Sequence, residues 1–417
     1  MFWEKEGKLI YSYDGETVCI EAWGKDALRV RVTKNRSFTG RDWALEAKDA
    51  HAGEVEIFED PSAKGGAFAN MYEGTDTSYG KITNGKLHAV IDSGSVITFY
   101  HEDGRVLLKE HFRRLRDEES MPLNIMGREY SNGVGDNFRI VTRFVARKGE
   151  KIFGMGQYQQ HELDLKGCML ELAQRNSQVS VPFYLSSIGY GFLWNNPGVG
   201  QVMFANNGTE WVTESGKEID YLVIAGDTPA EIEENYMTLT GKPPMMPEYG
   251  MGFWQCKLRY WNQEQLLSVA RKYKELGVPL DVIVVDFFHW TKQGEFKFDP
   301  KYWPDVPGMC RELKEMGIQV VVSVWPTVDI YSENFEEMKE KGYLVRTEHG
   351  VPLTMLCGGN EVFFDATNPD ARTYVWEKIK KNYYDQGAKL FWLDVAEPEY
   401  SVYDFKNYRY QLGSVQE

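Results

Sequence analysis

Three carboxylates follow an apolar segment near the C-terminal end of the sequence. The segment 388–393 has the length of a strand, and Asp394, Glu397 and Glu399 come soon after it. A carboxylate inside a buried strand is costly unless it has partners. At the C-terminal end of a parallel strand, however, it faces a cleft and can react. We therefore hypothesise that Asp394 is a catalytic nucleophile.

A second carboxylate, Asp286, closes another apolar segment, and aromatic residues accompany both aspartates. Phe287 and Phe288 follow Asp286, and Trp392 precedes Asp394. In a glycosidase subsite one carboxylate attacks, others hold hydroxyls, and aromatic rings stack on the sugar. A single aspartate at a strand end is more often a helix cap or a salt-bridge partner, but two such ends with neighbouring rings favour a sugar site. The residues expected at these strand ends are Gln255, Lys257, Asp286, His289, Trp290, Trp325, Asp329, Trp392, Asp394 and Glu397.

Strands and helices alternate after Pro247, and these elements must position the candidate residues. The pattern predicts strands over 249–256, 280–288, 318–326 and 389–394, and helices over 262–276, 307–316, 333–341 and 369–386. Nearly continuous apolar strands are typical of sheets that are covered on both faces. Strands that lead through loops to helices predict parallel pairing with right-handed crossovers. The expected fold is the first half, about four β/α units, of a TIM-type (β/α)8 barrel. An open parallel sheet is the alternative.

The first 240 residues have the pattern of an antiparallel β-sandwich. Segments such as 87–92 alternate apolar and polar residues and are bounded by Gly/Asp turns. The charged stretch 110–119 predicts a solvated loop. The stretch 170–176 predicts a polar loop that either lines a ligand cleft or lies on plain surface.

A helix and a linker are expected to end this domain. Thr228 and Pro229 suit the start of a short helix. The proline-rich segment 241–247 that follows predicts a stiff linker. The expected domains are therefore residues 1–240 and residues 248–417.

Composition excludes several classes of function. The net charge of −15 argues against nucleic acid, which demands basic patches. The sequence contains no run of about 18 apolar residues, so no membrane span is predicted. The N-terminus lacks the pattern of a signal peptide. The five scattered cysteines suggest reduced thiols in the cytoplasm. Neither a zinc motif nor a nucleotide fingerprint is present, so that no metal or cofactor is expected.

From about Phe153 to Glu399 the chain resembles glycoside hydrolase family 31, which contains retaining α-glucosidases and α-xylosidases. The resemblance rests on the segment 392–399 around Asp394, on 298–309, and on the aromatic hairpin 181–194. It implies that Asp394 is the nucleophile and that Glu397 supports it. It also implies that Asp286 binds hydroxyls of the sugar that is cleaved off. Trp325 and Trp392 would line the same pocket.

The resemblance favours an α-xylosidase over an α-glucosidase. Phe287 and Phe288 are bulky, and in xylose-preferring members such residues crowd the space that a hydroxymethyl group would need. The loop 170–179 also looks more like the xylosidase branch. The alternatives are an α-glucosidase or α-transglucosidase of the same family, or a non-catalytic carbohydrate-binding fragment. The expected ligand is an oligosaccharide or another α-glycoside, and a homo-oligomer is left open.

The sequence departs from the family pattern in one respect. The general acid/base of the family is an aspartate from a later barrel strand, and no residue up to Glu417 is a convincing candidate. We therefore expect this aspartate beyond residue 417, in a longer chain. Four strands alone would leave two open sheet edges.

Overall fold

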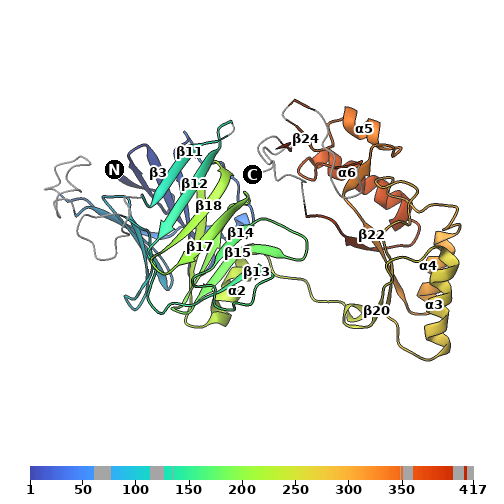
Figure 1. Ribbon diagram of the computed structural model, residues 1–417. Helices are drawn as coiled ribbons and strands as arrows, with labels where there is room; N and C mark the ends of the chain where they lie inside the picture. The colour runs from blue at the N-terminus through green and yellow to red at the C-terminus, as the bar shows by residue number, and fades with distance from the viewer. Residues whose placement is uncertain are drawn as a thin grey trace. The chain divides into compact units, whose positions relative to one another are not determined.

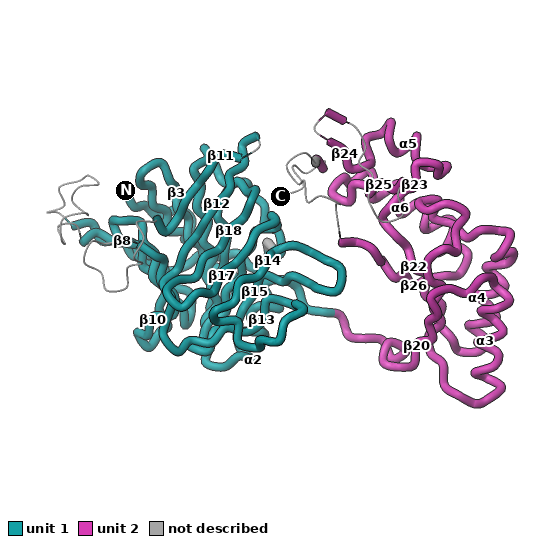
Figure 2. The backbone as a smooth tube through the Cα atoms, viewed as in Figure 1, with its two compact units in different colours: residues 1–243, 416–417 teal, residues 244–415 magenta. Residues whose placement is uncertain are grey.

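The computed structural model describes residues 1–60, 77–112, 126–133, 135–347, 349–350, 360–397 and 408–410. The chain divides into two compact units, residues 1–243 and residues 244–415 (Figures 1 and 2). The division falls within the proline-rich segment 241–247. Each unit has its own hydrophobic core.

Unit 1 consists of antiparallel sheets, and the sandwich-like fold predicted from the alternating pattern is confirmed. Within the described residues the largest sheet contains β1 (Phe2–Lys5), β2 (Lys8–Tyr13), β3 (Glu16–Trp23), β4 (Ala27–Thr33), β19 (Ile219–Ala225), β16 (Tyr190–Trp194), β15 (Val179–Ser186) and β13 (Ile152–Gln157), with β5 (Ala50–His51) beside β3. A second sheet contains β10 (Val106–Lys109), β9 (Ile97–His101), β8 (Leu87–Asp92), β7 (Tyr79–Asn84) and β6 (Glu54–Phe58). A third contains β11 (Arg128–Asn132), β12 (Phe138–Phe144), β18 (Gly208–Gly216), β17 (Gly200–Ala205) and β14 (Met169–Leu172).

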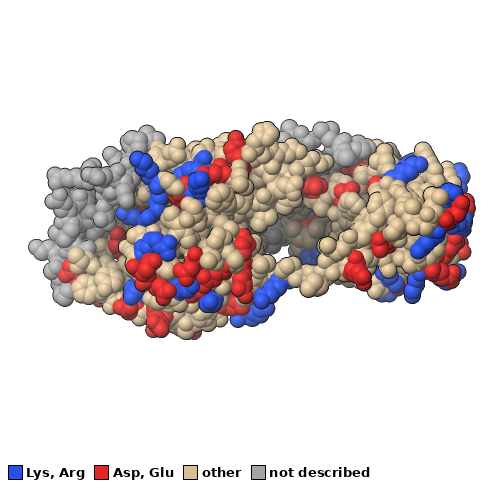
Figure 3. Space-filling view, turned by 90° about the horizontal axis from the view of Figure 1, so that it is seen from below, with Lys and Arg blue, Asp and Glu red and all other residues tan. Residues whose placement is uncertain are grey.

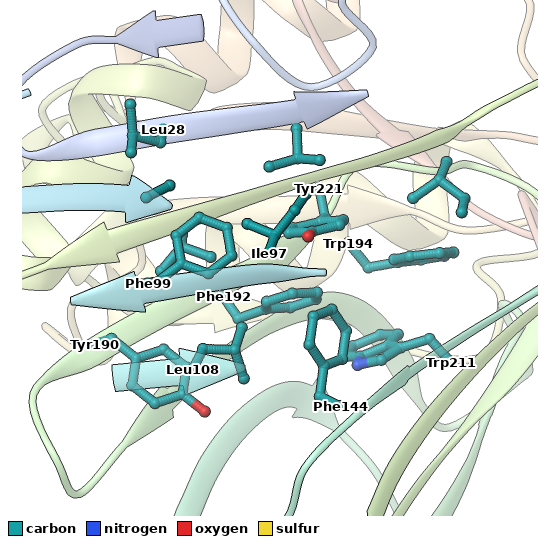
Figure 4. Close-up of a cluster of buried hydrophobic side chains, with 14 of the residues drawn as sticks. Leu28, Ile97, Phe99, Leu108, Phe144, Tyr190, Phe192, Trp194, Trp211 and Tyr221 are labelled. Carbon is teal, nitrogen blue, oxygen red and sulfur yellow. The ribbon is translucent and has the colours of Figure 1, made fainter. Parts of the chain in front are cut away.

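Aromatic side chains from all three sheets form the core of unit 1 (Figure 4). Phe192 and Tyr221 come from the largest sheet, Phe99 from the second, and Phe144 and Trp211 from the third. The ring centroids of Phe192 and Trp211 lie 5.2 Å apart, and those of Phe144 and Tyr221 lie 5.4 Å apart. These contacts bury the apolar face of each sheet against the others.

Two loop predictions in unit 1 are wrong for part of their range. Residues Met169–Leu172 form strand β14, because Leu170 and Leu172 are buried while Glu171 is exposed. Glu110 belongs to a stretch predicted to be solvated, yet it is only 2% exposed. Its carboxylate accepts hydrogen bonds from Arg128 and from the hydroxyl of Tyr221, so its charge is compensated. The rest of that stretch from residue 113 lies outside the described residues.

The predicted helix is present as α2 (Pro229–Thr240). The hydroxyl of Thr228 accepts a hydrogen bond from the backbone N–H of Glu231 over 3.2 Å, which caps the first turn. A short 3₁₀ helix, η1 (Ala47–Asp49), also belongs to this unit.

A buried ion pair links two neighbouring strands of the largest sheet. Arg29 on β4 donates to both carboxylate oxygens of Asp220 on β19, over 3.0 and 2.6 Å. The side chains of both residues are 1% exposed. Asn195 also donates to Asp220, and Asp42 accepts from Arg29. Such a pair is costly to break, since removal of one partner leaves the other charge buried without compensation.

We predict that Arg29→Met destabilises the protein by about 3–5 kcal/mol, because Asp220 would remain buried without its bidentate partner. Urea unfolding followed by intrinsic fluorescence measures this change. The control is Arg139→Met, which breaks the more exposed pair with Glu214 and should cost no more than about 1 kcal/mol. Equal effects of the two substitutions would contradict the prediction.

Unit 2 is built around a parallel sheet, as predicted. The strands are β20 (Trp254–Gln255), β21 (Val282–Val285), β22 (Gln319–Val324) and β26 (Leu390–Leu393), and neighbours pair in this order. The helices are η2 (Glu248–Met251), α3 (Gln263–Glu275), α4 (Val306–Glu315), α5 (Phe335–Glu340), α6 (Pro369–Ile379) and the π-helical turn η3 (Lys380–Tyr384). Short ribbons are formed by β23 (Thr327–Asp329) with β25 (Glu361–Phe363) and by β24 (Arg346–Thr347) with β27 (Tyr408–Arg409).

The first strand of this sheet is shorter than the predicted segment 249–256. Residues Glu248–Met251 form a 3₁₀ helix, and only Trp254 and Gln255 pair with β21. Gly250 and Gly252 lie within the predicted segment, and glycine weakens a strand. The other three strands and the helices were also predicted. Most of their ends lie within one or two residues of the predicted positions.

The surface seen in Figure 3 mixes both signs of charge over both units. On unit 2, for example, Arg271 pairs with Glu264 and Glu312, and Lys341 pairs with Glu337. In the part of the chain that is described, every helix is too short or too polar to cross a membrane.

Candidate active site

The parallel sheet of unit 2 has two different faces. One face packs against the helices and carries the side chains of Ile283, Val285, Val320, Val322, Val324 and Phe391. The other face holds a separate small cluster of Val282, Val284 and Val321 with Leu390 and with Tyr249 of the 3₁₀ helix η2, and we call it the helix-free face because none of the helices α3 to α6 contributes to this cluster. Because side chains alternate along a strand, each residue of the sheet can be assigned to the helix-covered face or to the helix-free face.

Asp394 extends strand β26 on the helix-free face. Leu393 pairs with Val324 of β22. The ladder continues one residue further, where the N–H of Asp394 donates to the carbonyl oxygen of Val324 over 3.1 Å. Phe391 packs on the helix-covered face, so that alternation directs Trp392 and Asp394 to the opposite side.

Asp286 ends β21 on the same face. Val285 pairs with Val322 and belongs to the helix-covered cluster, so the next side chain, that of Asp286, points to the other side. Trp325 lies just beyond the end of β22. The two carboxylates and the indole of Trp392 therefore share the C-terminal end of one face of the sheet.

Each aspartate accepts a hydrogen bond from the next backbone N–H, and a residue with positive φ follows within two positions. The N–H of Phe287 donates to Oδ1 of Asp286 over 2.8 Å, and the N–H of Val395 donates to Oδ1 of Asp394 over 2.9 Å. Phe288 and Val395 have positive φ angles of 63° and 55°. A β-branched residue is a genuine outlier there. Strain of this kind persists where surrounding contacts hold it, and it is concentrated at functional sites.

Aromatic rings adjoin Asp286. Phe287 stacks on Trp325 with 5.1 Å between ring centroids and 22° between ring planes. Phe288 lies 4.3 Å from Phe287, and Trp290 meets Trp325 edge-on at 5.8 Å. Phe288 is 54% exposed, so its ring is available to a ligand. These stacked rings form an aromatic wall beside the carboxylate.

Cys256, a residue that the sequence analysis did not single out, contacts Asp286. Its Sγ lies 3.5 Å from Oδ2 of Asp286. Burial, and next the nearby charge of Asp286, raise the pKa of the Cys256 thiol to about 11. The thiol is therefore protonated at neutral pH and donates its hydrogen bond to the carboxylate. Both oxygens of Asp286 thus have donors within the protein.

His289 lies behind the site rather than at its surface. It was expected among the residues at the strand ends, but it is 2% exposed. Its Nδ1 lies 2.9 Å from the carbonyl oxygen of Asp286, and its Nε2 lies 2.8 Å from the hydroxyl of Tyr383. A carbonyl only accepts, so Nδ1 carries the proton and Nε2 accepts from Tyr383. Burial lowers the pKa of His289 to about 4, which keeps the ring neutral in this role.

We predict that His289 stays neutral down to about pH 5. As the pH falls from 6.5 towards 4, the unfolded chain binds a proton that the folded chain refuses, so this group lowers stability across that window. The Cε1–H NMR resonance of His289, assigned by its loss in His289→Gln, should keep its neutral position at pH 5. A titration midpoint above about pH 6 would show that the ring is not held in this way.

The other predicted residues have more ordinary positions. Gln255 accepts a hydrogen bond from the hydroxyl of Tyr273 over 2.7 Å, which ties it to helix α3. Asp329 accepts from the N–H of Tyr331 in a local turn. Lys257 is exposed, and Glu397 is half-buried. Trp392 is 48% exposed at the edge strand β26, whereas Glu399 lies outside the described residues.

Comparison with known proteins identifies the family of the chain. Residues 243–414 match the TIM-barrel domain of glycosyl hydrolases family 31, and residues 17–202 match the N-terminal galactose mutarotase-like domain of glycosyl hydrolase 31. An uncharacterized family 31 glucosidase, ORF2 of Pseudescherichia vulneris, is 45% identical over 99% of this chain and 77% of its own length. The chain belongs to glycosyl hydrolase family 31.

Two further relatives in the family are α-xylosidases. A crystal structure of a family 31 α-xylosidase from a soil metagenome, complexed with xylose, superposes with a TM-score of 0.91 at 48% identity. It matches all of this chain and 60% of that enzyme. α-Xylosidase A of Aspergillus niger is 31% identical over 92% of this chain and 52% of its own length. The chain thus spans between about half and three quarters of the length of these relatives.

Proposed function

We propose that the protein is a retaining α-glycosidase that releases terminal α-linked xylose through a covalent intermediate on Asp394. One observation carries this proposal. Asp286 and Asp394 follow β21 and β26, the two strands that flank β22 in the parallel sheet, on its helix-free face, and the ring of Phe287 beside Asp286 stacks on Trp325 at the end of β22. Carboxylates beside aromatic rings suit a sugar ring whose transition state carries positive charge.

The resemblance to the family supports the roles that we assign to these residues. The Asp394 carboxylate attacks the anomeric carbon, and the bond to the leaving oxygen breaks as the new ester bond forms. A general acid, which the family resemblance expects beyond residue 417, protonates that oxygen. Water then gives a proton back to that group as its oxygen attacks the same carbon, and the ester bond breaks to release the sugar and the free carboxylate. Glu397 supports the nucleophile from the same segment.

Asp286 has the second role, in binding. Phe287 and Cys256 donate to its two oxygens, which fix the carboxylate and leave further lone pairs for sugar hydroxyls. Trp325, which stacks on Phe287, and Trp392 would contact the apolar faces of the sugar. The carbonyl of Asp286 is held in turn by His289.

Xylose is the favoured sugar because Phe287 and Phe288 are packed against each other directly after Asp286. Two rings there leave little room for a hydroxymethyl group. Relatives named as α-xylosidases support this choice. Other relatives are named as glucosidases, so hydrolysis or transfer of α-linked glucose is the second candidate function.

We also propose a cytoplasmic location, since the cysteines in the described part of the chain are free thiols.

We predict that 5-fluoro-α-xylosyl fluoride labels Asp394. Incubation of the whole protein that carries this chain should yield a 5-fluoroxylosyl ester on the peptide containing Asp394, detected by mass spectrometry after digestion. Asp394→Asn should lower the turnover of an aryl α-xyloside by at least roughly a thousandfold, because it removes the nucleophile.

The matched control is Asp385→Asn, which changes an exposed aspartate paired with Lys380 in the same unit and should leave turnover unchanged. A label on another residue would overturn the assignment of the nucleophile. If Asp394→Asn reduced neither turnover nor labelling, a carbohydrate-binding role would be the better description.

We predict that Phe288→Ala shifts specificity towards glucose. Loss of the exposed ring should raise the ratio of kcat/KM for an aryl α-glucoside to kcat/KM for the aryl α-xyloside by roughly tenfold. One extra or missing carbon group in an apolar pocket changes kcat/KM by a factor of this size. Phe288→Tyr keeps the bulk of the ring and should leave the ratio unchanged. A wild-type protein that already preferred the glucoside would contradict the xylose assignment itself.

A further inference from the structure

A buried cluster of polar side chains lies just beyond the end of strand β22. Nε2 of Gln293 donates to Oε2 of Glu361 over 2.8 Å, and the hydroxyl of Thr327 donates to the same oxygen over 3.1 Å. Gln293 also donates to the hydroxyl of Thr327. Glu361, the most exposed of the three residues, is only 8% exposed. The cluster is therefore closed to a ligand of the size of a sugar.

Neutral donors alone hold the carboxylate of Glu361. Among the described residues it forms no ion pair, and its hydrogen bonds come from Gln293 and Thr327. Burial raises the pKa of Glu361, and the hydrogen bond from Thr327 opposes this rise. A buried carboxylate with too few donors is costly. If either donor were removed, the chain around Glu361 should therefore move to compensate.

The cluster joins three segments that are distant in the sequence. Gln293 lies in the loop after β21, Thr327 is the first residue of β23, and Glu361 is the first residue of β25. The backbone reinforces this connection, because the N–H of Asp329 donates to the carbonyl oxygen of Gln293 over 3.1 Å. The loop after β21 is thus tied to both strands of the ribbon that follows β22.

The same contacts fix the chain directly after Trp325. The carbonyl oxygen of Pro326 accepts from the N–H of Phe364 over 3.0 Å. On the other side, Gly294 has a φ angle of 80°, and a Cβ at this position would lie 2.6 Å from Cα of Val328. Only glycine permits so close an approach of the two backbones. The segment 326–328 is therefore held from two sides.

A small cavity lies beside Trp325. Gln293 and Trp325 line this cavity together with Trp290 and Tyr383. A ring next to a cavity lacks packing contacts on that side. The position of Trp325, which stacks on Phe287 in the proposed site, therefore depends on where the chain leaves β22. The buried cluster determines that point.

We propose that Gln293, Thr327 and Glu361 are positioning residues, which hold the indole of Trp325 in place without touching the sugar. This inference rests on the proposed function and extends it to residues in the interior of unit 2. When a donor to Glu361 is lost, the segment 326–329 moves and the indole loses its alignment with the neighbouring ring. A small displacement of a group that contacts the substrate lowers the rate even when the altered residue is remote.

A double-mutant cycle with Trp325 tests this role, with turnover of an aryl α-xyloside by the whole protein that carries this chain as the readout. Trp325→Ala should itself lower kcat/KM. Gln293→Met should lower kcat/KM by about tenfold, mainly through a higher KM, because a misplaced group costs a factor of at least this size. In the Trp325→Ala background the same substitution should change kcat/KM by less than about twofold, since residues that act through one another are not additive.

Three further variants separate positioning from stability. Thr327→Val removes the other donor with little change in volume and should repeat the pattern of Gln293→Met, also where the latter fails to fold. Glu361→Gln should keep kcat/KM within about twofold of the wild-type value, because its amide oxygen accepts the same two hydrogen bonds. Asp305→Ala, which removes the cap of helix α4, should lower the melting temperature and leave kcat/KM unchanged.

Three results would overturn the inference while wild-type turnover supports the proposed function. The first is a lower melting temperature with unchanged kcat/KM in Gln293→Met and Thr327→Val, which describes a purely structural cluster. The second is a loss that persists undiminished in the Trp325→Ala background. The third is an unchanged kcat/KM in Trp325→Ala itself. If the wild-type protein turned over neither an aryl α-xyloside nor an aryl α-glucoside, the proposed function would fall, and this inference with it.

Discussion

The parallel pairing of β22 with β21 on one side and β26 on the other is the constraint on which the proposed site depends. Because side chains alternate along each strand, this register alone decides that Asp286 and Asp394 emerge on the same face. A shift of one residue in β26 would turn Asp394 towards the helices and bring Leu393 to the helix-free face. The apolar contacts of Val322, Val324 and Phe391 with the helices oppose such a shift. The packing of the helix-covered face thus determines which side chains lie on the helix-free face.

Buried polar groups then hold the loops that leave these strands. The carboxylate of Asp286 receives hydrogen bonds from Phe287 and Cys256, and its carbonyl receives one from His289. The strained φ angles of Phe288 and Val395 are tolerated beside these contacts. In unit 1 the pair of Arg29 and Asp220 joins β4 to β19 in a comparable manner. In both units, therefore, polar groups with satisfied partners specify how neighbouring segments fit together.

Much of this arrangement could be predicted from the sequence, because its signals are local. Apolar segments that end in Asp286 and Asp394 predicted the parallel strands, and alternation in segments such as Leu87–Asp92 predicted the antiparallel sheets. Other features depend on contacts between distant residues and have no local signal. The burial of Glu110 follows from Arg128 and Tyr221, which come from two other strands.

The contacts around Asp286 illustrate the same limit. Its thiol donor is 30 residues earlier in the chain, and the hydroxyl that orients His289 is 94 residues later. His289 looked like a surface residue because it follows a strand end, yet its partner Tyr383 draws it into the core. The only sequence signal that could have found the link is the placement of aromatic residues at 383 and 384 before the last strand, and that pattern alone is ambiguous.

The π-helical turn Lys380–Tyr384 has a consequence for how related sequences can vary. A π turn accommodates one residue more than an α-helical turn, and each residue of a helix rotates the next side chain by about 100°. Loss of one residue there would therefore turn position 383 away from His289 and leave the imidazole without its donor. Related chains that lack the extra residue should carry a different side chain at position 289, so that helix length and residue 289 change together during evolution.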